Sequence, residues 1–89
     1  MFFYTHIWAI DLIIYIMKLS QMSIGQVGLV ESIKTQQDYK NRLTILGLTK
    51  GVKITVIRKA IFNGPIQIKL RDFYLAISKN IADKIIVKI

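Results

Sequence analysis

The sequence predicts a mainly β fold: a small barrel or rolled sheet of about five short strands with one inserted α-helix. Three observations support this prediction. Short stretches in which apolar and polar residues alternate are separated by residues that favour turns. One stretch with helical spacing, at about residues 36–46, stands between the first strand and the second. The chain has 89 residues, which allows one small domain with a modest core.

The first strand is expected at Val27–Ile33, after a turn framed by Gly25 and Gly28. The helix at about 36–46 follows a short polar connection. Its start offers two alternative N-caps and one favourable acidic residue, which are Ser32, Thr35 and Asp38. One face of this helix is apolar and consists of Tyr39, Leu43 and Leu46.

The helix end is the clearest local signal in the chain. Gly47 stands where a helix C-terminus favours a residue that can take a positive φ. If Leu46 is the last helical residue, Leu48 can contact Leu43 in a Schellman-type closure. Gly51 then precedes a segment whose apolar period changes from helical to alternating.

Two strands joined by a hairpin are predicted next. The first runs from Val52 to about Ala60, and the second is Ile66–Arg71 with its isoleucines and leucine pointing inward. Asn63 and Gly64 both tolerate a positive φ, so Asn-Gly between alternating stretches indicates the hairpin. Pro65 cannot donate a ladder hydrogen bond immediately afterwards.

The C-terminal part predicts a turn, a strand, a single helical turn and a closing strand. The turn is Arg71-Asp72, and Phe73–Ile77 forms the strand after it. Ser78 can cap a helical turn over residues 78–82. Residues 83–89 then close the chain as the last strand.

Residues suited to catalysis or metal binding are scarce. The sequence has no cysteine, which makes a reducing, cytoplasmic location the default, and its only histidine is His6. The serines therefore have no histidine partner outside the apolar first stretch, and the nearest ligand pair is His6 with Asp11. The other carboxylates are scattered through different elements: Glu31, Asp38, Asp72 and Asp83. We expect no catalytic residue, no metal ligand and no bound cofactor.

Residues 1–16 form a hydrophobic extension ahead of the domain expected at 17–89. As a helix the extension would be about 25 Å long against a hydrocarbon core of about 30 Å, and Asp11 offsets most of its insertion free energy. A signal peptide would need a positive n-region and a small-residue cleavage site, and neither is present. Two interpretations remain: a start upstream of the natural initiator Met17, which we favour, or a membrane-associated segment.

A basic surface with an apolar tip is the strongest functional signal. Thirteen Lys and Arg against five Asp and Glu give a net charge of +8, which suits a phosphate backbone, an anionic membrane or an acidic protein. Ile61 and Phe62 lie at the predicted hairpin tip, where large apolar residues are unusual. Alternatively, Phe62 folds back onto the core and the lysines only solubilise the domain. The residues expected to contact a partner are Arg42, Thr49, Lys50, Ile61 and Phe62.

Four short motifs occur in a characteristic order. They are Leu19-x-x-Met22-x-x-Gly25-x-x-Gly28, Arg42-Leu43-x-x-Leu46-Gly47-Leu48-x-x-Gly51, Asn63-Gly64-Pro65-Ile66, and Ala76-Ile77-Ser78 followed by Ala82 and Ile85-Ile86-Val87. Each motif is weak alone, but their order and spacing together resemble the FeoA family of ferrous-iron transport accessory proteins. The family usually has proline where Ile61 stands and glycine where Asp72 stands, and the hydrophobic extension has no counterpart in it.

The resemblance implies an SH3-like β-barrel with an inserted helix and a non-catalytic role in ferrous-iron uptake. The implied partner is FeoB, a membrane transporter whose cytosolic G domain hydrolyses GTP. The implied location is cytoplasmic, at the inner face of the membrane through that partner. The residues that define this fold are Gly25, Gly28, Leu43, Leu46, Gly47, Leu48, Gly51, Gly64 and Pro65.

A second hypothesis is a basic regulatory or nucleic-acid-binding module, similar to the SH3-like domains appended to iron-dependent repressors. The high positive charge motivates it. The sparse aromatic residues argue against it, because Tyr39, Phe62, Phe73 and Tyr74 do not suggest a base-stacking platform. We therefore do not expect a nucleic-acid partner or direct membrane insertion, and a homo-oligomer remains open.

Overall fold

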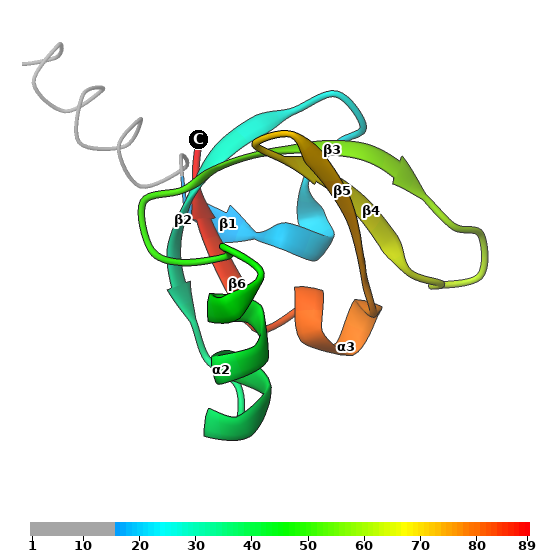
Figure 1. Cartoon of the computed structure of the whole chain (residues 1–89). Helices are drawn as coiled ribbons and strands as arrows, with labels where there is room; N and C mark the ends of the chain where they lie inside the picture. Colours follow the sequence, from blue (N-terminus) through cyan, green and yellow to red (C-terminus); the bar gives the residue numbers. More distant parts are fainter. Residues whose placement is uncertain (1–15) are drawn as a thin grey trace, which may run out of the picture.

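Residues 16–89 of the computed structural model form one rolled antiparallel sheet with two α-helices (Figure 1). The strand order in the sheet is β1-β6-β2-β3-β4-β5. The elements in chain order are β1 (Ile16–Lys18), the 3-10 helix η1 (Leu19–Gln21), β2 (Val27–Ile33), α2 (Gln37–Ile45), β3 (Lys53–Lys59), β4 (Ile66–Leu70), β5 (Phe73–Ile77), α3 (Lys79–Ala82) and β6 (Ile85–Lys88). The predicted fold class is confirmed: the domain is mainly β, with one longer inserted helix and one short helical turn.

The described residues contain six strands, one more than the sequence predicts. The additional strand is β1, where Ile16 pairs with Lys88 and Lys18 pairs with Ile86. Three residues are too few to show an alternating pattern, so only the pairing with β6 defines this strand. Ile16 thus belongs to the sheet, one residue before the expected domain start. The rest of the predicted extension, residues 1–15, lies outside the described residues.

The core lies inside the rolled sheet, and the alternation predicted for β3 and β4 accounts for much of it. Ile54 and Val56 of β3 are fully buried, as are Ile68 and Leu70 of β4. The segment ahead of β2 contributes Leu19 and Met22, which are also fully buried. Among residues 16–89, the buried apolar side chains are Leu19, Met22, Val30, Ile33, Leu43, Leu48, Ile54, Val56, Ile66, Ile68, Leu70, Ile77, Ala82, Ile85 and Val87.

The start of α2 differs from the prediction. Neither Ser32 nor Thr35 caps the helix, because the N-cap residue is Gln36, and its side chain makes no capping hydrogen bond. β2 ends at Ile33 as predicted, and the Lys34 N–H still bonds the carbonyl of Lys84 at 2.7 Å. Because the first helical residue is Gln37, the N-cap position falls on Gln36 and not on either predicted cap. Asp38 does lie in the first turn.

The apolar face of α2 is narrower than the sequence predicts. Leu43 alone is buried in this helix, whereas Tyr39 and Leu46 are 37% and 42% exposed. Ile45 is 84% exposed. Figure 1 shows the reason, since α2 extends away from the sheet rather than lying across it. Most of the helix surface therefore faces solvent.

The end of α2 is the Schellman closure that the sequence predicts. The helix stops at Ile45, Leu46 is its C-cap residue, and Gly47 has a φ of +93°. The Gly47 N–H bonds the Thr44 carbonyl, and the Leu48 N–H bonds the Leu43 carbonyl, each at 2.9 Å. Both leucines are buried, so the closure attaches the helix end to the core.

The positive φ angles in the β3–β4 loop agree with the prediction at Asn63 but not at Gly64. They belong to Phe62 and Asn63, at 56° and 59°, and Gly64 does not share them. Gly64 is instead required by space, because a Cβ there would stand 2.7 Å from the Cβ of Ala60. The loop is thus longer than a two-residue Asn-Gly turn, and the turn centre lies one residue earlier.

Two further turns refine the prediction. Gly25 forms the turn ahead of β2 with a φ of +88°, but Gly28 lies within β2, where a Cβ would approach the Lys88 carbonyl to 3.3 Å. In the β4–β5 turn the left-handed residue is Arg71, with a φ of 55°, and not Asp72. Strand pairing sets which residue occupies each turn position, so single-residue preferences did not locate them.

The C-terminal elements agree with the prediction except at the start of the last strand. The Ser78 side chain accepts a hydrogen bond from the Ile81 N–H and caps α3. Asp83 is the C-cap residue of α3, so β6 begins at Ile85 and not at Asp83. Within residues 16–89, no helix is long and apolar enough to cross a membrane.

Candidate docking surfaces

A concavity between β2 and the end of α2 gathers part of the predicted contact set. Thr49 and Lys50 line it from the loop after α2, and it has a volume of about 300 Å³. Lys40 from α2 and Glu31 from β2 stand on its walls. Arg42 is exposed on α2, but it does not line this concavity. The concavity is therefore polar and mixed in charge.

The β3–β4 loop presents the two predicted apolar residues to solvent. Ile61 is 78% exposed and Phe62 is 93% exposed. The alternative that Phe62 folds back onto the core is therefore wrong. Phe62 also has a φ of 56°, a conformation that is unfavourable for a bulky side chain. An exposed aromatic residue in a strained conformation contributes little to the fold itself, which suits a contact residue.

The five predicted contact residues do not form one site. In Figure 1 the β3–β4 loop projects from one end of the sheet, while α2 and the loop that follows it lie at another part of the molecule. Thr49 and Lys50 stand together, Ile61 and Phe62 stand together, and Arg42 lies on the surface of α2. The chain thus offers at least two separate candidate docking surfaces.

A third surface, which the sequence analysis did not select, is a basic groove along β3 and β4. We call it the β3–β4 groove; its volume is about 550 Å³, and its lining residues are Gly51, Val52, Lys53, Thr55, Lys69 and Arg71. Three of these side chains are cationic and none is acidic. Thr55 pairs directly with Lys69 across the two strands. The outward residues alternate with the buried ones of the core, so the same period that forms the core also forms this groove.

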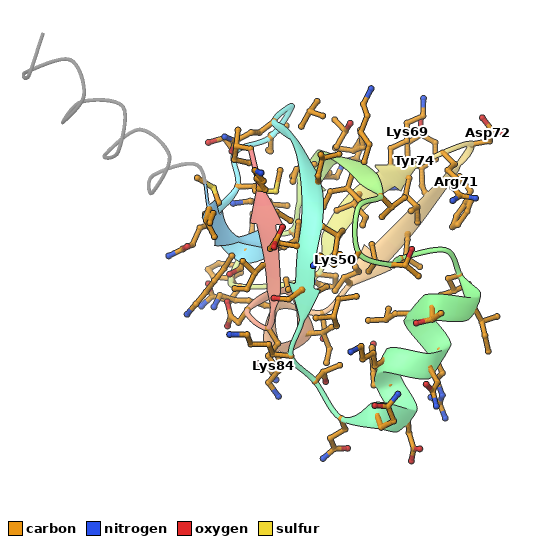
Figure 2. The ribbon with its side chains drawn as sticks, turned by 90° about the vertical axis from the view of Figure 1, so that its left-hand side faces the viewer. Lys50, Lys69, Arg71, Asp72, Tyr74 and Lys84 are labelled. Atoms are coloured by element: carbon orange, nitrogen blue, oxygen red, sulfur yellow. The ribbon has the colours of Figure 1, made fainter. Side chains whose placement is uncertain are left out.

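Strand pairing extends one side of the groove into a row across four strands. Val27 pairs with Thr55, Thr55 with Lys69, and Lys69 with Tyr74. The Lys69 Nζ stands 6.0 Å from the centroid of the Tyr74 ring, which is within range of a weak cation–π contact. Figure 2 shows Lys69, Tyr74 and Arg71 close together at one end of the sheet, with Lys50 well apart from them.

The sequence contains a usable signal for this groove. Lys53 and Thr55 stand two residues apart on one predicted strand, and Lys69 and Arg71 stand two apart on the next. Residues at this spacing point to the same face of a strand. Combined with the hairpin prediction, the spacing indicates a basic outer face, but only the register brings Tyr74 beside Lys69.

A polar cluster joins the chain ahead of β2 to α3. The Ser20 hydroxyl donates a hydrogen bond to the Asp83 carboxylate, and the Lys79 Nζ lies 3.2 Å from the other carboxylate oxygen. The Lys59 Nζ donates to the Ser20 carbonyl at 3.1 Å. The Ser20 hydrogen bond, followed by that from Lys79, lowers the pKa of Asp83 below its ordinary value. These contacts give Asp83 a structural role that its position in the sequence did not reveal.

The described surfaces are suited to binding. Within residues 16–89, no group of three or more His, Cys, Asp or Glu side chains lies close enough to hold a metal ion. His6 and Asp11, the pair considered from the sequence, lie outside the described residues. The groove and the two predicted surfaces can instead offer cations and exposed apolar side chains to a partner.

Comparison with known proteins decides the family. A family model described as the FeoA domain matches residues 17–89. The chain belongs to the FeoA family. The solution structure of FeoA from Chlorobium tepidum is 34% identical, with a TM-score of 0.78 over 82% of this chain and 70% of that one. The family assignment made from the four motifs is therefore confirmed.

Two other solved structures share this fold at lower sequence identity. FeoA from Stenotrophomonas maltophilia, solved with zinc and described as an SH3 domain protein, is 24% identical, with a TM-score of 0.70 over 81% of this chain and 89% of that one. A manganese-dependent transcriptional repressor is 18% identical, with a TM-score of 0.75 over 82% of this chain and 41% of that one. At these identities the likeness concerns the SH3-like fold alone. A comparison with curated protein sequences gives no significant match.

Proposed function

We propose that this FeoA-family chain is a non-catalytic accessory module of ferrous-iron uptake that docks on the cytosolic part of a FeoB-type transporter. The observation that carries the proposal is the match to the FeoA domain along residues 17–89. The Stenotrophomonas maltophilia protein is described as a candidate bacterial ferrous iron transport activating factor. In this proposal the chain acts in the cytoplasm and reaches the inner face of the membrane through the transporter.

Ile61 and Phe62 are the proposed apolar anchor for this docking. These large side chains are 78% and 93% exposed, so their removal from water by a partner would stabilise the complex. Interfaces commonly depend on a few buried aromatic anchors surrounded by polar and cationic residues. Arg42 on α2, and Thr49 with Lys50 in the loop after it, are the other proposed contacts. The side chains of Arg42 and Lys50 would favour an acidic counterpart.

The proposal is tested by a pull-down with the soluble cytosolic domain of the transporter at low salt. Two versions of the chain are used, one starting at Met1 and one starting at Met17, so that the hydrophobic extension does not decide the result. Binding by either version supports the proposal, and binding by neither version contradicts it. Phe62→Asn should weaken binding, whereas Ile45→Gln removes a comparably exposed apolar residue on α2 and serves as the matched control.

A second candidate function is a regulatory module that binds nucleic acid. Residues 16–89 carry thirteen cationic and four acidic side chains, a net charge of +9, and the manganese-dependent repressor shares the fold. Binding to phosphates would weaken steeply as salt increases, because counterions are released on binding. A titration of duplex DNA at several salt concentrations tests this candidate, and the absence of salt-dependent binding would remove it.

A further inference from the structure

Strand β5 lies at one edge of the sheet, and its sequence has none of the features that usually protect an edge. β4 lies along one side of β5, and none of the described strands lies along the other (Figure 1). Phe73–Ile77 contains no charged residue and no proline, and its pairing with β4 shows no bulge. Natural proteins usually carry such features because an open edge pairs readily with another chain. The β5 edge is therefore open to a further strand.

The open edge presents the backbone of two exposed residues. Two residues connect β4 to β5, so the pair next to the loop, Leu70 and Phe73, is a hydrogen-bonded pair of the ladder. The alternation of the ladder then turns the N–H and C=O groups of Tyr74 and Ala76 away from β4. Both residues are exposed, and among residues 16–89 no turn or loop backbone group bonds to them.

The side chains beside this edge are mainly cationic. Lys69 pairs with Tyr74 in the register, Arg71 follows in the loop, and Asp72 is the only acidic residue in that loop. Neighbouring strands lie about 4.8 Å apart, so a residue added opposite Tyr74 would stand about 10 Å from the backbone of Lys69. That distance is within the combined reach of a lysine and a glutamate side chain. The β3–β4 groove adds Lys53 to the same positive surface.

We propose that the β5 edge binds an extended, acidic peptide segment of a partner protein by strand addition. The backbone groups of Tyr74 and Ala76 form the main-chain hydrogen bonds to the added strand. Lys69 and Arg71 select acidic side chains on that strand. The site serves any protein that presents such a segment, so this inference does not rest on the proposed transporter as the partner.

Charge argues against a second copy of the chain as the occupant. Each chain has a net charge of +8, and β5 itself carries no acidic residue. Pairing two β5 edges would join two positively charged surfaces into one sheet, with Lys69 on the strand next to β5 in each copy. Like charges brought together in this way destabilise a strand pair, whereas an acidic segment is attracted.

The test uses a peptide of about ten residues in which Glu and Val alternate, with both ends blocked, added to the isotope-labelled chain. The backbone amide signals of Tyr74 and Ala76 should shift, and their hydrogen exchange should slow. The equivalent peptide of Lys and Val should bind at least about tenfold more weakly. Equal binding of the two peptides, or no binding of the acidic peptide at millimolar concentration, would overturn the proposal.

The substitution Ala76→Pro tests whether the outward N–H of the β5 edge is needed for peptide binding. Proline removes the outward N–H at this position but no hydrogen bond to β4, so the melting temperature should change little. Binding of the Glu–Val peptide should fall at least about tenfold. Ala76→Thr keeps the N–H and is the matched control, which should bind as the unmodified chain does. An Ala76→Pro chain that binds with unchanged affinity refutes strand addition.

Two further outcomes are decisive. A chain that sediments as a dimer, and as a monomer after Ala76→Pro, would overturn the proposal because a second copy would then occupy the edge.

If Ala76→Pro does not fold, the double variant Lys69→Glu with Arg71→Glu replaces it. This variant should lose the preference for the Glu–Val peptide over the Lys–Val peptide. Retained preference would overturn the assignment of the two cations.

Discussion

The Ser20 hydroxyl donates a hydrogen bond to the carboxylate of Asp83, a residue 63 positions later in the chain. This contact joins η1 to the C-terminal end of α3, next to the ion pair between Asp83 and Lys79. Both the hydroxyl and the ammonium group stabilise the ionised carboxylate, which is why the pKa of Asp83 lies below its ordinary value of 3.8. The segment ahead of β2 is thus attached to the barrel by polar contacts as well as by its buried leucine and methionine.

The Asp83 contacts predict a pH-dependent contribution to stability. A carboxyl group with a lowered pKa in the folded state stabilises the fold at pH values above its unfolded pKa, and the contribution is lost as the pH falls through the folded pKa. Asp83→Asn should therefore lower the melting temperature at neutral pH, and the difference from the unmodified chain should shrink below about pH 3.8. Thermal melts between neutral and acid pH measure this, and a difference that is constant over the range would contradict it.

At Gly47, in the Schellman closure, we predict that a larger side chain lowers stability through the backbone conformation and not through a steric clash. Gly47 has a φ of +93°, and a Cβ at this position would meet no atom within 4 Å. Gly47→Val should therefore lower the free energy of unfolding by about 1 kcal/mol or more, through the left-handed conformation alone. Gly47→Asn should cost less, because asparagine tolerates this conformation. Urea unfolding of both variants measures the costs, and equal stability of all three chains would refute the geometry.

The β4–β5 turn predicts opposite effects for two neighbouring glycine substitutions. Arg71 has a φ of 55°, so Arg71→Gly relieves strain and should raise the free energy of unfolding by about 0.5 kcal/mol. Asp72 does not have a positive φ, and Asp72→Gly should lower stability by a similar amount because glycine loses more entropy on folding. Urea unfolding distinguishes the two. Stabilisation by Asp72→Gly instead would place the left-handed residue at Asp72.

For Phe62→Asn we predict that the stability of the fold is kept while binding to the transporter domain weakens. Asparagine suits a φ of 56° better than phenylalanine, and Phe62 is 93% exposed, so Phe62→Asn should leave the fold unchanged or slightly more stable. The same change should weaken docking to the transporter domain by about tenfold, which corresponds to about 1.4 kcal/mol. A variant that loses stability and binds normally would contradict the assignment of Phe62 to docking.

Local signals account for what could be predicted from the sequence. The alternation of Ile66, Ile68 and Leu70 identified β4 and its buried face, and Gly47 with Leu48 identified the end of α2. Ser78 was identified as the cap of α3 for the same reason. In each case a few neighbouring residues contain the whole physical cause, so no knowledge of the tertiary structure is needed.

Features that depend on pairing could not be predicted in this way. β1 has three residues and exists as a strand because β6 pairs with it. The cap of α2 was misplaced because the helix begins at Gln37, after a hydrogen bond from the Lys34 N–H to the Lys84 carbonyl. Likewise the sequence showed Lys69 and Tyr74 as separate residues, and only the register between β4 and β5 places them side by side. The exposed Ile61 and Phe62 could be predicted from their loop position, whereas the contact between Lys69 and Tyr74 depends on the register.

The most direct test of the account is a calorimetric titration of the chain, started at Met17, with the soluble cytosolic domain of a FeoB-type transporter. The account predicts saturable binding at low salt that weakens as salt increases, because the domain has a strong positive charge. Phe62→Asn should weaken it further, while Ile45→Gln should not. The absence of saturable binding at low salt, with both the Met17 and the Met1 starts, would contradict the central claim that this FeoA-family chain docks on the transporter.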